Sequence, residues 1–174
     1  MHIPLVMTII GRDRPGLVDL VARIVSEHGG NWLESRMSRL GGHFAGILRI
    51  HVPRERQAGL EQALRALDRE GLAVVAHADA SLPAPDQKAS IVLEFVGQDR
   101  PGIVRQISGA LARHGVNVEE LSSECSSAPM SGETLFKAQA RLFVPPTCDL
   151  AALRVELEKI AADLVVDITL QPIN

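Results

Sequence analysis

The sequence of 174 residues contains no tyrosine and a single tryptophan, Trp32, and aromatic residues make up 3% of it. Proteins that bind single-stranded nucleic acid stack bases on aromatic side chains, so such stacking platforms are nearly absent here. The formal net charge is −3, and no cluster of Lys and Arg compensates for it. Because basic side chains supply most of the affinity for phosphates, direct DNA binding is disfavoured.

Metal and redox motifs are also missing. The two cysteines, Cys125 and Cys148, are spaced neither as a metal pair nor as a redox Cys-x-x-Cys motif. The six histidines show no ligand spacing either. We therefore expect reduced structural thiols, with no metal site and no cofactor.

Long hydrophobic runs and a targeting segment are not found. No apolar run approaches the 18 residues that a membrane span needs, and residues 1–10 lack a basic leader and a cleavage site. Hydrophobic residues make up 46% of the chain and charged residues 22%, which is ordinary for a packed globular protein. We expect a cytoplasmic protein that does not contact membranes.

An internal repeat organises the chain. With a shift of 86 residues, residues 9–34 match residues 95–120 at ten of 26 positions. Further along the shift becomes 92, so the second copy carries six extra residues, which fall in the polar stretch 122–134. The identical pairs are Gly11/Gly97, Asp13/Asp99, Arg14/Arg100, Pro15/Pro101, Gly16/Gly102, Val18/Val104, His28/His114, Gly29/Gly115, Asn31/Asn117 and Glu34/Glu120.

A proline-containing stretch without periodicity separates the two copies and is typical of a linker. We therefore predict one domain at residues 1–82, a linker at 83–88 and a second domain at 89–174.

Each copy is predicted to form strand, helix, strand, strand, helix, strand. The expected strands are residues 3–10, 31–40, 43–52 and 72–80 in the first copy, and 90–96, 117–125, 134–144 and 164–172 in the second. Apolar residues recur at a spacing of 3.6 in the helices, as at Leu17, Val18 and Val21. Because such helices need a sheet to cover, we predict an α+β, ferredoxin-like βαββαβ fold, with antiparallel sheets and both helices on one face.

The first strand has apolar residues at both parities, for example Leu5 and Met7 on one side and Val6 and Ile10 on the other. A sheet covered by helices on one face leaves its other face open. This pattern indicates that the open face or an edge is buried too, against the other domain or another subunit.

The repeated motif Gly-x-Asp-Arg-Pro-Gly lies between the first strand and the first helix. Pro15 and Pro101 suit the first helical position, Asp13 and Asp99 are placed to cap or precap the helix, and Gly16 and Gly102 leave its first turn bare. A bare helix start offers backbone N–H groups to a small carboxylate. The same residues are also simply good helix-start chemistry, so both interpretations stay open.

Asn31 and Asn117 follow the first helix in each copy, and their amides offer a donor and an acceptor to an amino-acid head group. An Asn after a Gly is equally a routine turn residue. Arg14 and Arg100 are either carboxylate ligands or solvated loop residues. Glu34 and Glu120 could contact a ligand ammonium, although a strand-edge carboxylate is the simpler interpretation.

An enzyme is a rival class that the sequence does not favour. Ser35, Ser38, His43 and Asp68 form no nucleophile elbow, and neither do Cys125 and His114. We expect a protein without catalytic residues.

The whole chain resembles a tandem of ACT domains, which are βαββαβ regulatory modules. The Asp-Arg-Pro-Gly-(Leu/Ile)-Val turn followed by His-Gly-x-Asn is characteristic of them and occurs here twice. In that family amino acids bind at interfaces between modules. The resemblance implies ligand-binding residues at Asp13, Arg14, Pro15, Gly16 and Asn31, and at Asp99, Arg100, Pro101, Gly102 and Asn117.

Two such modules with nothing attached resemble the glycine cleavage system transcriptional repressor family. This resemblance implies a glycine-responsive regulator that forms oligomers and contacts a LysR-type transcriptional activator rather than DNA. The alternative is a ligand-free ACT-domain scaffold that regulates a metabolic enzyme. Because only the second copy has the long loop at 122–134, we expect the two copies to share a fold but to differ as sites.

Overall fold

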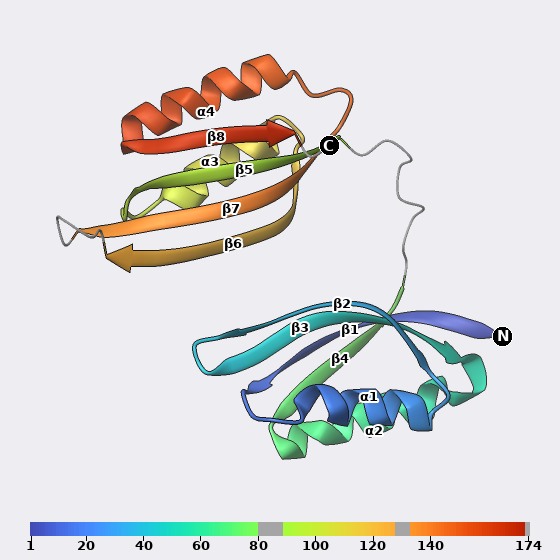
Figure 1. The fold of residues 1–174 in the computed structure, drawn as a ribbon. Helices are drawn as coiled ribbons and strands as arrows, with labels where there is room; N and C mark the ends of the chain where they lie inside the picture. Colours follow the sequence, from blue (N-terminus) through green and yellow to red (C-terminus); the bar gives the residue numbers. More distant parts are fainter. Residues whose placement is uncertain (80–88, 128–132, 173–174) are drawn as a thin grey trace. The chain divides into compact units, whose positions relative to one another are not determined.

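The computed structural model describes residues 1–79, 89–127 and 133–172. Contacts divide the chain into two compact units, Met1–Pro83 and Ala84–Asn174, which are described separately below (Figure 1). The predicted linker at 83–88 and most of the six-residue insertion lie outside the described residues.

Both units have the predicted order of elements. The first contains β1 (His2–Arg12), α1 (Leu17–Glu27), β2 (Asn31–Leu40), β3 (His43–Pro53), the 3-10 turn η1 (Arg54–Arg56), α2 (Gln57–Ala66), the 3-10 turn η2 (Leu67–Glu70) and β4 (Leu72–Ala78). The second contains β5 (Ala89–Gln98), α3 (Ile103–Arg113), β6 (Asn117–Ser127), β7 (Thr134–Val144), α4 (Leu150–Leu164) and β8 (Val166–Pro172). The strand orders β2-β3-β1-β4 and β6-β7-β5-β8, all antiparallel, confirm the ferredoxin-like fold in both copies.

Each unit has its own core between its helices and one face of its sheet. In the first unit β1 contributes Leu5, Met7 and Ile9, which are at most 2% exposed, and α1 contributes Leu17 and Val21. The second core is built the same way. No polar or charged residue is buried among the described residues. Apolar packing alone therefore holds each helix layer on its sheet.

The starts of α1 and α3 differ from the prediction. Gly16 and Gly102 occupy the N-cap positions with φ angles of 90° and 97°, so each Pro lies one residue before the cap. Neither helix has a side-chain cap, and the predicted capping by Asp13 and Asp99 is wrong. The chain leaves the strand through a left-handed residue that glycine adopts without strain, and this turn moves the aspartates away from the helix.

The ends of the same helices agree with the prediction. Gly29 and Gly115 follow the helices with φ angles of 68° and 70°. The Nδ1 atom of His28 lies 2.8 Å from the carbonyl oxygen of Ile24.

Val18 and Val104, which share the helical periodicity, remain 45% and 40% exposed.

None of the helices in the described part of the chain is long and apolar enough to span a membrane. No group of three or more His, Cys, Asp or Glu residues in that part is placed to hold a metal ion.

Candidate functional site

The two halves of the predicted site lie at opposite ends of each unit. In the first unit Asn31 pairs with His51, at the level of Pro4 near the start of β1. The Gly-x-Asp-Arg-Pro-Gly turn follows the other end of β1, beyond Gly11. The 11 residues of α1 separate them, a length of about 16 Å at 1.5 Å per residue.

The second unit repeats this separation, because Asn117 pairs with Phe143 whereas Gly97 pairs with Phe136, seven residues away on β7. A single amino acid cannot touch the turn and the asparagine of the same unit. A complete site of this kind needs two modules.

The turn of the first unit is closed, meaning that ion pairs to β2 and η2 occupy its charged side chains. The backbone N–H of Asp13 donates to the Gly42 carbonyl at 3.0 Å, and its carboxylate accepts from Arg39 Nε at 2.5 Å. Arg14 contacts Glu70, with Nη2 at 3.4 Å from its carbonyl oxygen and 3.7 Å from its carboxylate. The side chains of Asp13 and Arg14 are therefore both engaged in ion pairs.

The turn of the second unit has the same backbone but different partners. The Asp99 N–H donates to the Thr134 carbonyl at 2.9 Å, which is the same anchor as in the first unit. Arg100 donates to the side chain of Gln98 at 2.9 Å. Within the described ranges, the Asp99 carboxylate has no hydrogen bond or ion pair.

A substitution between the copies explains this difference. Arg39 lies opposite Phe44 on β3, and the equivalent position of the second unit, opposite Phe136 on β7, is Cys125. A thiol cannot form the ion pair that closes the first turn. The exposed Cys125 therefore leaves the carboxylate of Asp99 available.

A hollow of about 300 Å³ opens at the turn of the second unit. This volume is at the lower end of the range for small-molecule sites. Arg105, in the first turn of α3, adds a second guanidinium, and its equivalent in the first unit is Asp19. The hollow is lined by Asp99, Arg100, Gly102, Ile103, Val104, Arg105 and Phe136.

The recurring glutamates are engaged in ion pairs on the open face of each sheet. A β-bulge after Trp32 and after Val118 precedes Glu34 and Glu120. Arg49 Nη1 lies 3.6 Å from the carboxylate of Glu34, and Arg141 pairs with Glu120 in the same way. The sequence interpretation missed these arginines, although both occupy one position of the aligned third strands. Their presence favours a structural role for the glutamates.

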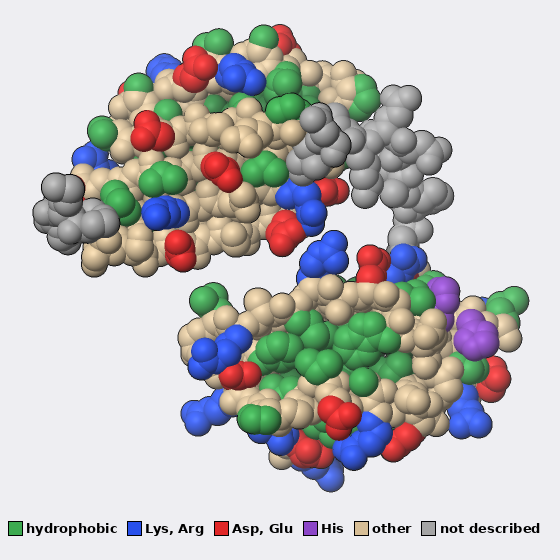
Figure 2. Space-filling model, in the orientation of Figure 1, with side chains coloured by type: hydrophobic (Ala, Val, Ile, Leu, Met, Phe, Trp, Pro, Cys, Tyr) green, Lys and Arg blue, Asp and Glu red, His purple; other side chains and the backbone are tan. Residues whose placement is uncertain are grey.

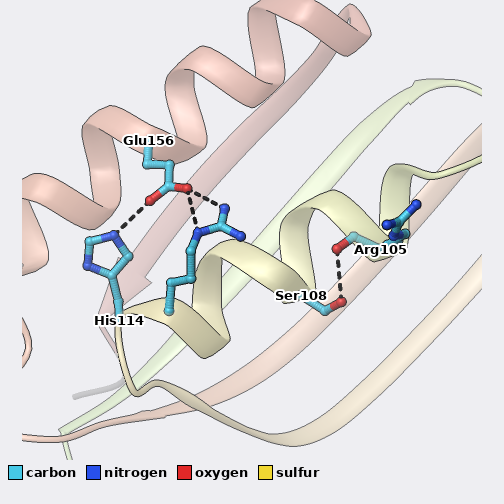
Figure 3. A network of polar contacts seen from close by, with 5 residues as sticks. Arg105, Ser108, His114 and Glu156 are labelled. Carbon is cyan, nitrogen blue, oxygen red and sulfur yellow. Dashed lines mark hydrogen bonds and ion pairs between the residues drawn. The ribbon is translucent and has the colours of Figure 1, made fainter.

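Another polar cluster joins α3 to α4 in the second unit (Figure 3). Arg113 Nε donates to Glu156 at 3.1 Å, and His114 Nε2 lies 2.9 Å from the second carboxylate oxygen. The hydrogen bond from Arg113, and then that from His114, lowers the pKa of Glu156 below its ordinary value. Figure 3 shows Arg105 nearer the start of α3, away from this cluster. His114 therefore links the end of α3 to Glu156 on α4, and it is not paired with Cys125.

ACT domain family models match residues 4–77 and 91–136. The chain is 26% identical over 161 residues to the glycine cleavage system transcriptional repressor of Escherichia coli (strain K12), covering 92% of this chain and 85% of that protein.

Two solved structures cover the full chain. An unknown protein from Galdieria sulphuraria has a TM-score of 0.85 at 30% identity, with 100% of both chains covered. A structure described as a candidate glycine cleavage system transcriptional repressor has a TM-score of 0.73 at 23% identity, covering 100% of this chain and 99% of that one. The second likeness supports the fold alone.

Proposed function

Since this chain belongs to the ACT domain family, with one such domain in each unit, we propose that it is a non-enzymatic regulatory protein that senses a small amino acid. The similarity to a glycine cleavage system transcriptional repressor makes glycine the first ligand to test. The output is a protein–protein contact with a LysR-type transcriptional activator. Such a contact would place the protein in the cytoplasm.

The main support for this proposal is the open turn of the second unit, in which the Asp99 carboxylate has no ion-pair partner among the described residues. An amino-acid zwitterion needs one anionic and one cationic partner close together, and Asp99 and Arg105 line the same small hollow. In our pose the ligand carboxylate lies at the start of α3, where Arg105 and the uncapped N–H groups can bind it. The ligand ammonium faces Asp99.

An asparagine from another module completes the site. β2 and β6 are edge strands, so either can pair with a strand of a second module. In an antiparallel pairing the start of one strand, which bears Asn31 or Asn117, approaches the far end of the other. That end lies beside the turn, as the contact between Arg39 and Asp13 demonstrates for the first unit.

Apolar side chains near these edges support association. Val18 and Leu33 are 45% and 40% exposed in the first unit, and Val104 and Leu121 are 40% and 47% exposed in the second. Figure 2 shows apolar side chains gathered on the visible face of the first unit, between the places of α1 and the strands in Figure 1. Their burial at a module interface would favour a homo-oligomer.

The signal is passed through thermodynamic linkage between ligand binding and partner binding. A ligand shifts partner binding only by its different affinities for two states of the protein, which typically amounts to about 1–3 kcal/mol. A site shared by two modules provides such states, because the ligand favours the arrangement in which both contact it.

A thermal-shift and calorimetric screen of the common amino acids on the purified chain tests the proposal. We expect glycine or a similar amino acid to raise the Tm, and Asp99→Asn and Arg105→Gln to abolish that rise. Asp13→Asn is the matched control in the first unit and should keep it. Asn31→Ala and Asn117→Ala reveal which asparagine completes the site.

If no amino acid raises the Tm at millimolar concentration, sensing is refuted. The alternative, a ligand-free ACT-domain scaffold that regulates a metabolic enzyme, is favoured by the closed turn of the first unit and would then be preferred. For the partner, affinity capture with mass spectrometry should identify a LysR-type activator. Repeated capture without any transcription factor would contradict that part of the proposal.

A further inference from the structure

The two units differ in the sheet face that their helices leave open. In the first unit apolar side chains surround Thr8 at the centre of this face, and Ile10, Ile47 and Val75 are 53%, 54% and 52% exposed. Strand registers place Thr8 between Ile47 and Val75, and Ile10 between Ala45 and Ala73. The apolar positions of this face are Val6, Ile10, Ala45, Ile47, Ala73 and Val75.

The same positions of the second unit are mostly polar. Glu94 replaces Thr8 at the centre and lies between Gln139 and Thr169. The equivalents of the six apolar residues are Val92, Val96, Lys137, Gln139, Asp167 and Thr169. An antiparallel sheet with one solvated face alternates between apolar and polar side chains, as the second unit does. In the first unit the middle of β1, β3 and β4 has the apolar pattern of a buried face, whereas the edge strand β2 presents Glu34, Arg36 and Ser38 there.

Charges at the two ends of this face have opposite signs. Arg12 and His43 pair at the end near the turn. Glu34 and Asp79 lie with Arg49 at the other end, where Arg49 Nε is 2.6 Å from the Asp79 carboxylate. A two-fold axis that crosses the strands at Thr8 and Ile47 sets the basic end of one copy against the acidic end of the other. The face is therefore complementary to itself.

The open face of the second unit fits this surface poorly. Packing there would bury Lys137 and Asp167, together with Glu94 and the Gln139 amide that donates to it, against valine and isoleucine, and taking charges out of water is strongly unfavourable. A second copy of the apolar face instead sets valine and isoleucine against each other. Arg36, which lies opposite Ile47 on the same face, is on the edge strand β2, where its guanidinium can stay in water.

The size of the face is adequate for a dimer. β1 and β3 have 11 residues each, and the sheet has four strands. β2 and β4 add 10 and 7 residues. With a rise of about 3.4 Å per residue and a spacing of about 4.8 Å between strands, the face covers about 640 Å². Two such faces bury about 1,300 Å², which lies within the range of specific interfaces.

We propose that the open sheet face of the first unit packs against the same face of a second copy of this chain, around a two-fold axis near Thr8 and Ile47. This contact uses a sheet face, so it is separate from the pairing of strand edges proposed for the ligand site.

Light scattering after gel filtration and sedimentation velocity of the full chain test this contact. We expect Ile47→Glu and Ile47→Lys each to halve the mass of the wild-type assembly. Mixing the two variants should restore the mass, because the axis brings the two substituted positions together. Gln139→Lys, at the equivalent position of the second unit and opposite Glu94, is the matched control for Ile47→Lys and should leave the mass unchanged.

Thr8→Glu and Thr8→Lys provide a second pair if the Ile47 variants do not fold, because the second unit already accommodates Glu94 at that position. A monomeric wild type, an unchanged mass in the variants, or a mixture that stays at half mass would each overturn the proposal. Amino-acid-induced rises in Tm are measured on the same variants. They report on the ligand site independently of this contact.

Discussion

The first glycine of the repeated motif is predicted to be required for steric reasons. A Cβ atom on Gly11 would lie 2.5 Å from the carbonyl oxygen of Gly71 and 3.2 Å from Cα of Leu72. Both are backbone atoms at the start of β4, so a rotamer change cannot relieve the contact. Gly97 is equally tight, since its Cβ would lie 2.8 Å from the carbonyl oxygen of Val165. We expect Gly11→Ala to destabilise the first unit by about 1–3 kcal/mol, as overpacking typically does.

The loss of stability in Gly11→Ala can be measured for the first unit alone, because Trp32 is the single tryptophan and packs against the core of that unit. With a denaturant dependence of about 1.5 kcal/mol per molar urea, the midpoint of the fluorescence transition should fall by about 0.7–2 M. Gly97→Ala should lower the stability seen by far-UV circular dichroism and leave the fluorescence midpoint in place.

Gly16→Ala separates steric from conformational causes. Nothing lies within 4 Å of a Cβ there, but φ is 90°, so only backbone strain of about 1–2 kcal/mol opposes the substitution. An unchanged fluorescence midpoint in Gly11→Ala would refute the steric explanation. An equal shift in Gly97→Ala would refute the independence of the two units.

Three further predictions address the second unit. Cys125→Arg should give Asp99 the ion-pair partner that Arg39 gives Asp13, and should weaken amino-acid binding at least several-fold by calorimetry; unchanged affinity would contradict the role of the open turn. Because hydrogen bonds from Arg113 and His114 lower the pKa of Glu156 in the folded protein, its stabilising effect is fully present above the ordinary pKa of a glutamate and is lost as the pH falls through the lower folded-state pKa. Thermal unfolding in acid should therefore depend less on pH in Glu156→Gln than in the wild type. Val165 is β-branched, 66% exposed and has a φ of 55°, where the equivalent Gly71 has 80°. Val165→Gly should stabilise the second unit by about 0.5–1 kcal/mol, since relief of left-handed strain exceeds the added entropy of the unfolded chain; a lower melting temperature would contradict this.

The spacing of apolar residues was sufficient to predict the fold, because it reflects the local preference of each segment for helix or strand. The stripes that contain Leu17 and Val21 and the alternation along β3 follow from which face a residue buries. The glycines after each first helix follow from the left-handed conformation that ends it. The helix starts were predicted less well. Asp-x-Pro-Gly suits several capping geometries, and the sequence pattern did not indicate that Gly16 adopts the left-handed conformation at the N-cap.

The sequence by itself determined that this chain is two copies of one βαββαβ module, and that a turn and an asparagine recur in each. Only the tertiary structure decided that these two features lie at opposite ends of a module, and that Arg39 closes one turn where Cys125 leaves the other open. It also decided which sheet face stays uncovered. The physical reason is that repeats and periodicity report on neighbours along the chain. Ion pairs across strands and the composition of a sheet face depend on strand register, which brings together residues far apart in sequence.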